Sequence, residues 1–110
     1  MTPFAPEWLW LSVAGLSEVV WTVTLKYTDG FTRLSWSLAT LAAMAVSFYC
    51  MSRALQVLPI GTVYAVWTGI GAAGAALWGM AVEGDPATPL RILCLVLILA
   101  GVAGLKLAHG

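Results

Sequence analysis

The chain has 110 residues, of which 61% are hydrophobic and only 9% are charged, and its formal net charge is zero. Soluble globular domains are roughly half apolar and about a quarter charged, so this composition excludes an ordinary soluble domain and indicates a membrane protein. A chain with no net positive charge also offers no basic surface for nucleic acid. The length favours one domain, which we take as residues 1–110.

Four apolar segments follow one another along the chain, near residues 8–27, 35–56, 60–82 and 89–107. Each has about 20 residues, the length that an α-helix needs to cross a hydrocarbon core of roughly 30 Å. Turn-forming sequences separate them, namely residues 28–30 (TDG), 58–61 (LPIG) and 83–86 (EGDP). The sequence therefore predicts an all-α integral membrane protein with four transmembrane helices, in which short connections make neighbouring helices antiparallel.

The basic residues give little preference for one orientation in the membrane. With four spans, Lys26, Arg33 and Arg91 fall on one side, and Arg53 and Lys106 fall on the other. A bias of three against two permits insertion in both orientations, although a single marginal charge can still decide the topology. We expect Lys26 and Arg33 to reach the lipid headgroups without a chemical role.

One acidic residue, Glu18, falls at mid-depth in the first predicted helix. An ionised carboxylate in hydrocarbon is costly unless it is paired, so such residues are rare and usually functional. A carboxyl group in this position can hold either a proton or a cation. The structural alternative is a permanently protonated Glu18 that hydrogen-bonds to a neighbouring helix. Ala14 and Gly15, one turn earlier on the same face, are small and leave room beside it.

Polar and aromatic side chains are expected around this carboxylate. Trp21 stands three residues after Glu18 on the same helical face, and its indole can only donate a hydrogen bond. Tyr64 and Trp67 have the same spacing on the third predicted helix, and Ser47 is a mid-helix hydroxyl on the second. Taken singly, each aromatic residue is well explained by packing or interfacial anchoring. Together with Glu18 they predict a cation site.

Glycines crowd the last two predicted helices and suggest close helix packing or a kink. They are Gly69, Gly71, Gly74, Gly101 and Gly104. The first three match the G-x-G-x-x-G pattern of dinucleotide-binding proteins, but no strand precedes them, so we reject that reading. We find no pattern of metal ligands, no nucleophile beside a base and no phosphate-binding loop, and we expect neither an enzyme nor a cofactor.

Four stretches of the chain resemble the small multidrug resistance transporters. They are residues 15–21 (GLSEVVW), 25–33 (LKYTDGFTR), 59–72 (PIGTVYAVWTGIGA) and 101–107. Trp21, together with the later Trp67-Thr68-Gly69, is similar to the guanidinium-exporter branch of that family. The third loop departs from the family pattern, because Asp85 stands where Glu is expected and Glu83 is additional.

The resemblance implies an antiparallel, dual-topology homodimer in the inner (plasma) membrane that exports guanidinium ion, or small substituted guanidinium compounds, in exchange for protons. On the matching positions Glu18 would bind proton and cation alternately, and Trp21, Ser47, Tyr64 and Trp67 would form its hydrogen-bonding shell. Two alternatives remain. One is a multidrug exporter of quaternary ammonium cations, which Trp21 disfavours by narrowing the site. The other is a non-transporting membrane subunit that pairs with an unlike partner.

Overall fold

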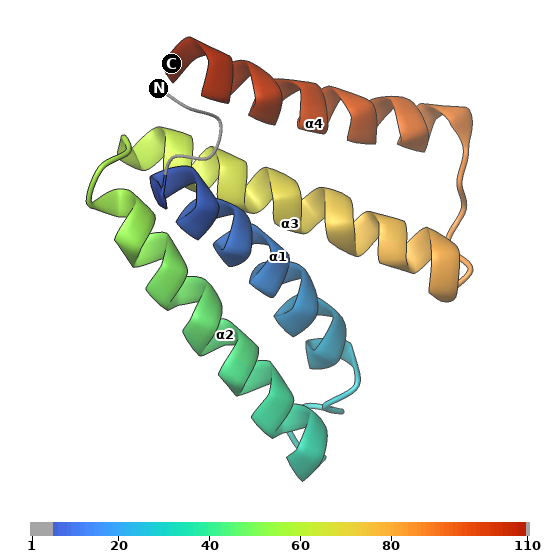
Figure 1. Ribbon diagram of the computed structural model, residues 1–110. Coiled ribbons are helices and arrows are strands. Elements are labelled where there is room, and N and C mark those ends of the chain that lie inside the picture. The colour runs from blue at the N-terminus through green and yellow to red at the C-terminus, as the bar shows by residue number, and fades with distance from the viewer. Residues whose placement is uncertain (1–5, 110) are drawn as a thin grey trace.

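The computed structural model describes residues 6–109, which form four α-helices and their connections (Figure 1). The helices are α1 (Pro6–Lys26), α2 (Leu34–Leu55), α3 (Ile60–Val82) and α4 (Pro89–His109). All four are long and apolar enough to cross a membrane. The prediction of four transmembrane helices is confirmed, and each helix begins and ends within two residues of the expected position.

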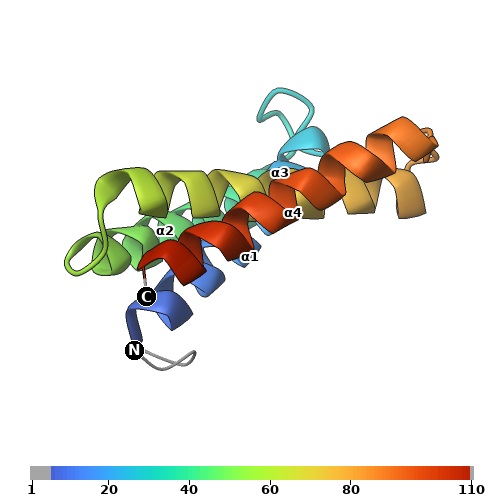
Figure 2. The same cartoon turned by 90° about the horizontal axis from the view of Figure 1, so that it is seen from above.

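Helix α1 lies between α2 and α3 and contacts both, whereas α4 packs mainly against α3 (Figures 1 and 2). The buried apolar core lies where the start of α1 meets the end of α2 and the start of α3. It consists of Trp8, Leu11, Ala54, Leu58, Val63 and Val66. The core therefore holds one end of the first three helices together and leaves the middle of α1 for polar side chains.

A tight turn reverses the chain between α1 and α2. The carbonyl of buried Thr28 accepts hydrogen bonds from the backbone N–H groups of Thr32 (2.9 Å) and Arg33 (3.0 Å). Asp29 and Phe31 adopt positive φ angles of 50° and 66°, a left-handed conformation that is uncommon for non-glycine residues. This turn ends α1 and sets α2 antiparallel beside it.

Helix α4 differs from the other three because none of the residues in its apolar span is buried within the chain. Its large apolar side chains, such as Leu93 and Leu97, are more than half exposed. In water an apolar surface of this extent would favour aggregation, whereas in a bilayer it faces lipid or another protein. The chain is a multi-pass membrane protein.

Candidate functional site

Glu18 lies near the middle of the 21-residue helix α1. At a rise of about 1.5 Å per residue it is roughly 18 Å from the start of the helix, close to the centre of a bilayer. Its carboxylate lies directly against the backbone of α3 at the buried Gly71. A Cβ atom at position 71 would overlap the carboxylate, so the glycine provides the space that this side chain occupies.

Two buried polar atoms at this position have no hydrogen-bond partner among residues 6–109: Oε2 of Glu18 and Nε1 of Trp21. The carboxylate oxygen is an acceptor and the indole nitrogen is a donor. No basic side chain forms an ion pair with Glu18 in the described part of the chain. Leaving such groups unpaired costs free energy, so each of them needs a partner such as a water, an ion or a ligand.

A hydrogen-bonded network connects the three helices around this site. Trp67 of α3 donates from Nε1 to the hydroxyl of Ser47 on α2 at 2.9 Å. Ser47, which is fully buried, donates in turn to the carbonyl of Ala14 on α1 at 2.7 Å. Ala14 is one turn before Glu18, so the network fixes the relative positions of the helices beside the carboxylate. It also orients the Trp67 indole toward α2.

Aromatic side chains of α1, α2 and α3 pack against one another near Glu18. Phe48 makes an edge contact with Trp21 at 6.4 Å between ring centroids and lies 6.1 Å from Trp67. Tyr64 is 6.1 Å from Trp67 but remains 63% exposed, so within one chain its hydroxyl stays outside the network. Sequence reasoning did not identify Phe48, because one phenylalanine in an apolar helix carries no distinguishing pattern.

Gly69, Gly71 and Gly74 of α3 lie at close helix contacts, whereas the two glycines of α4 do not. A Cβ at Gly69 would come within 2.6 Å of Val102 on α4, and one at Gly74 would overlap Val19 on α1. Gly101 and Gly104 have no atom within 4 Å of where a Cβ would stand. The sequence predicts free space beside Gly15, but the Ile70 side chain of α3 fills it. A Cβ atom at Gly15 would lie 2.8 Å from Ile70.

A second polar cluster lies at the end of α1, about two helical turns beyond Glu18. Lys26 forms an ion pair with Glu83 at 3.0 Å, and the Tyr27 hydroxyl donates to the same carboxylate oxygen at 2.5 Å. The hydrogen bonds from Tyr27 and then Lys26 hold the pKa of Glu83 below its usual value. This ion pair connects α1 to the loop that follows α3, and it is a partner for Lys26 that sequence reasoning did not identify.

The arrangement around Glu18 can bind a cation that donates hydrogen bonds. The carboxylate supplies the charge and an open acceptor oxygen. Trp21, Phe48 and Trp67 supply aromatic rings, which favour cations and planar groups. The same carboxylate can instead be neutralised by one proton, so the arrangement allows a cation and a proton to compete for it.

The sequence is similar to known proteins over most of its length. Residues 6–98 match the sequence profile of the family described as "Small Multidrug Resistance protein". A protein from Citrobacter freundii named "Guanidinium exporter" is 57% identical over 102 residues, covering 93% of this chain and 97% of its own length. Proteins of the same name from Salmonella typhimurium strain LT2 and Escherichia coli strain K12 are each 54% identical with the same coverage.

Proposed function

The chain belongs to the small multidrug resistance family, and we propose that it exports guanidinium-type cations across the membrane in exchange for protons. Glu18 binds the proton and the cation alternately. A site that holds only one of them at a time couples their opposite movements when it is exposed first to one side of the membrane and then to the other. In this proposal the chain is a transporter and not an enzyme.

The single observation that carries this proposal is the buried Oε2 atom of Glu18, which has no hydrogen-bond partner or counter-ion among residues 6–109. A permanently protonated structural glutamate would be expected to donate to a neighbouring helix. Instead, the carboxylate lies against Gly71, which has no side chain to accept that proton. Its partner therefore comes from outside the chain.

Guanidinium fits the donors and acceptors at this site better than a quaternary ammonium ion does. It is planar and permanently charged, and it can donate two parallel hydrogen bonds to one carboxylate. Its faces can stack on indole rings such as those of Trp21 and Trp67. A tetra-alkyl ammonium ion has no N–H group to offer, so it would leave the buried oxygen of Glu18 unpaired.

The uncovered apolar surface of α4 supports assembly with a second copy of the chain. Four helices, of which one packs mainly on a single neighbour, are few to enclose a path for an ion. In an inverted pair only a residue at mid-depth meets its own counterpart at the same level, and Glu18 has that position. The three-to-two distribution of basic residues is compatible with both orientations. We therefore propose an antiparallel homodimer with Trp21, Ser47, Tyr64 and Trp67 around the two carboxylates.

The cargo is tested by measuring exchange in proteoliposomes with a panel of guanidinium and tetra-alkyl ammonium ions at one pH. We expect guanidinium and singly substituted guanidinium compounds to exchange for protons much faster than small tetra-alkyl ammonium ions. Faster movement of the tetra-alkyl ions would contradict the proposed cargo and favour a multidrug exporter. Failure to move either class would favour a non-transporting subunit.

The same assay tests the role of Trp21. Trp21→Gly should weaken guanidinium exchange several-fold or more, because it removes an indole face on which the cation can stack, an interaction of about 0.5–2 kcal/mol. It should also widen the site and admit bulkier cations. Trp78→Gly is the matched control. Trp78 lies on α3 near the polar cluster of Lys26 and Glu83, away from the aromatic rings around Glu18. Equal selectivity in the two variants would show that Trp21 does not set the size of the site.

A further inference from the structure

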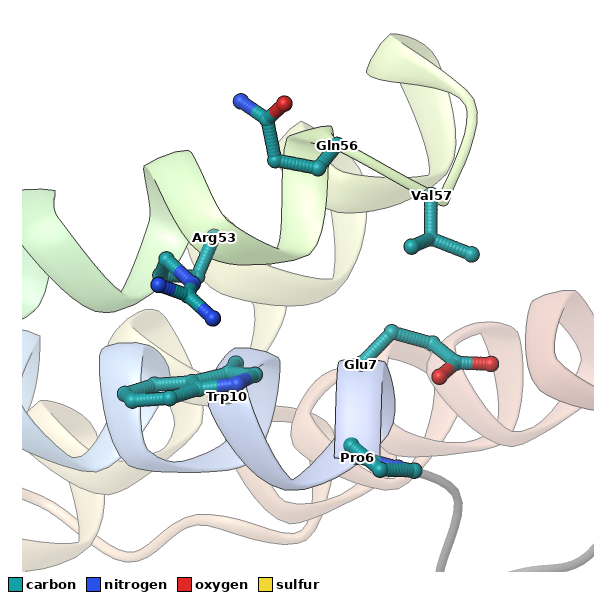
Figure 3. Close-up of a pocket in the computed structure, with 6 residues that line it drawn as sticks. All are labelled: Pro6, Glu7, Trp10, Arg53, Gln56 and Val57. Carbon is teal, nitrogen blue, oxygen red and sulfur yellow. The ribbon is translucent and has the colours of Figure 1, made fainter.

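A polar pocket of about 520 Å³ lies at the end of the molecule where α1 begins and α2 ends. It is lined by Pro6, Glu7, Trp10, Arg53, Gln56 and Val57 (Figure 3). The ends of transmembrane helices lie at the level of the lipid headgroups, so this pocket faces the interface and not the hydrocarbon. The pocket shares no lining residue with the Glu18 site.

The pocket presents one positive and one negative group that do not pair with each other. The Arg53 guanidinium lies over the Trp10 ring, 5.1 Å from its centroid, and forms no ion pair with any residue the structure describes. The carboxylate of Glu7 points away from Arg53 (Figure 3). An arginine held against an indole keeps its N–H groups at the edge of the plane, where they can bind a phosphate or carboxylate.

An apolar groove of about 320 Å³ adjoins this pocket and shares Pro6 and Trp10 with it. Its other lining residues, Leu9 and Val13, are both exposed; Leu9 lies in the same turn of α1 as Trp10, and Val13 lies about one turn further toward the middle of the helix. The two hollows together form a site with charged groups at the interface and apolar side chains toward the membrane core. That order matches the two parts of a phospholipid.

We propose that this site binds one phospholipid whose headgroup carries a primary ammonium group, as in phosphatidylethanolamine. Arg53 binds the phosphate with its fork of N–H donors, Glu7 accepts hydrogen bonds from the ammonium group, and an acyl chain lies in the groove along Leu9 and Val13. A choline headgroup has no N–H to donate to Glu7. The headgroup of phosphatidylglycerol has no positive group to pair with the Glu7 carboxylate. Free phosphate could bind Arg53 but has no acyl chain to fill the groove.

Native mass spectrometry of the full-length protein in detergent tests this assignment, with equal amounts of phosphatidylethanolamine, phosphatidylcholine and phosphatidylglycerol added. We expect phosphatidylethanolamine to be retained most. Arg53→Gln should reduce its retention about tenfold or more, the loss expected for charge-assisted hydrogen bonds. Glu7→Leu should leave binding in place but remove the preference over phosphatidylcholine, because leucine cannot accept a hydrogen bond from the ammonium group. Arg33→Gln, which removes a basic residue at the opposite end, is the matched control and should change nothing.

Several results would overturn the proposal. Equal retention of phosphatidylethanolamine by Arg53→Gln and the unmodified protein would place the lipid elsewhere. A preference for phosphatidylglycerol would show that the pocket recognises negative charge and that Glu7 plays no part. Displacement of the bound lipid by soluble phosphoethanolamine at equal concentration would exclude the groove as an acyl-chain site, whereas retention in its presence supports both halves of the site.

Discussion

Gly71 is the residue of α3 that determines how closely this helix approaches Glu18. Its missing side chain leaves the volume that the carboxylate fills, and the contact joins a buried glycine to the half-buried Glu18, whose Oε2 atom is buried. Any larger residue would have to displace either the carboxylate or the α3 backbone. In the proposed function the glycine therefore acts through the position of Glu18 rather than through chemistry of its own.

We predict that Gly71→Ala impairs guanidinium exchange and also destabilises the protein by about 1–3 kcal/mol, the usual cost of inserting a methyl group into a packed site. Gly61→Ala is the matched control, because it makes the same change near the start of α3 where no atom lies within 4 Å. Exchange assays and thermal unfolding in detergent provide the two measurements. Unchanged exchange by Gly71→Ala would show that the carboxylate does not need this position.

Much of the site was predictable at the level of single residues. Glu18 stands out because an acidic residue in a long apolar segment has few structural explanations. Ser47 and Trp67 were expected near it, and they do form one network beside it. The close contact of Glu18 with Gly71 was not predictable, because it depends on where two helices cross, and sequence spacing along one helix does not contain that information.

The helix boundaries were predictable because turn-forming residues interrupt each apolar segment. The sequence did not reveal that α4 would remain unburied. All four segments are predominantly apolar, and although the fourth has the highest mean hydropathy, hydropathy alone does not show which membrane helix lies in the centre of the bundle and which lies at its edge. The partner of Lys26 was also missed, because Glu83 lies beyond the end of α3 and only the folded loop brings it to α1.

The ion pair and hydrogen bond at Glu83 connect the end of α1 to the α3–α4 loop. Tyr27 and Lys26 hold the pKa of Glu83 below its usual value near 4.5. The folded protein therefore binds a proton at Glu83 less readily than the unfolded chain does. The stabilisation from this carboxylate is present above about pH 4.5 and is lost as the pH falls through the lower, folded-state pKa.

We predict that Glu83→Gln lowers the melting temperature in detergent at neutral pH, by a few degrees at most because exposed ion pairs contribute little. The difference in melting temperature between this variant and the unmodified protein should shrink steadily from neutral pH to about pH 3. Lys26→Gln removes the other partner of the ion pair. The double variant of Lys26→Gln and Glu83→Gln should have a melting temperature only slightly below that of either single variant. A difference that grew toward acid pH would contradict this account.

The orientation of the whole molecule follows from the small imbalance of its basic residues. We predict that a C-terminal reporter appears on both sides of the membrane in comparable amounts. Replacing the exposed Ser35 and Ala87 by Lys adds two charges to the side that already has three, so this variant should insert in one orientation and lose most activity. Gln at the same two positions is the control and should leave both orientations populated.

Rescue by co-expression makes this test specific for an antiparallel pair. A second variant with Val57→Lys, Ile60→Lys, Arg33→Gln and Arg91→Gln has four basic residues on the side of the turn between α2 and α3 and one on the other side, a bias as large as the five-to-two bias of the first variant and opposite in direction. Together the two inactive variants should restore exchange, because they insert in opposite orientations and can form the inverted pair. Full activity of either variant alone would favour a parallel assembly or an unlike partner.

The central claim, that one carboxylate carries both the proton and the cation, is tested most directly by Glu18→Gln in proteoliposomes. Glutamine keeps the shape and polarity of the side chain but cannot bind and release a proton. The measurement is proton movement driven by a guanidinium gradient, with Glu83→Gln as the matched control outside the site. We predict that Glu18→Gln folds and assembles but shows no exchange, while Glu83→Gln still exchanges. Exchange by Glu18→Gln at the rate of the unmodified protein would contradict the account.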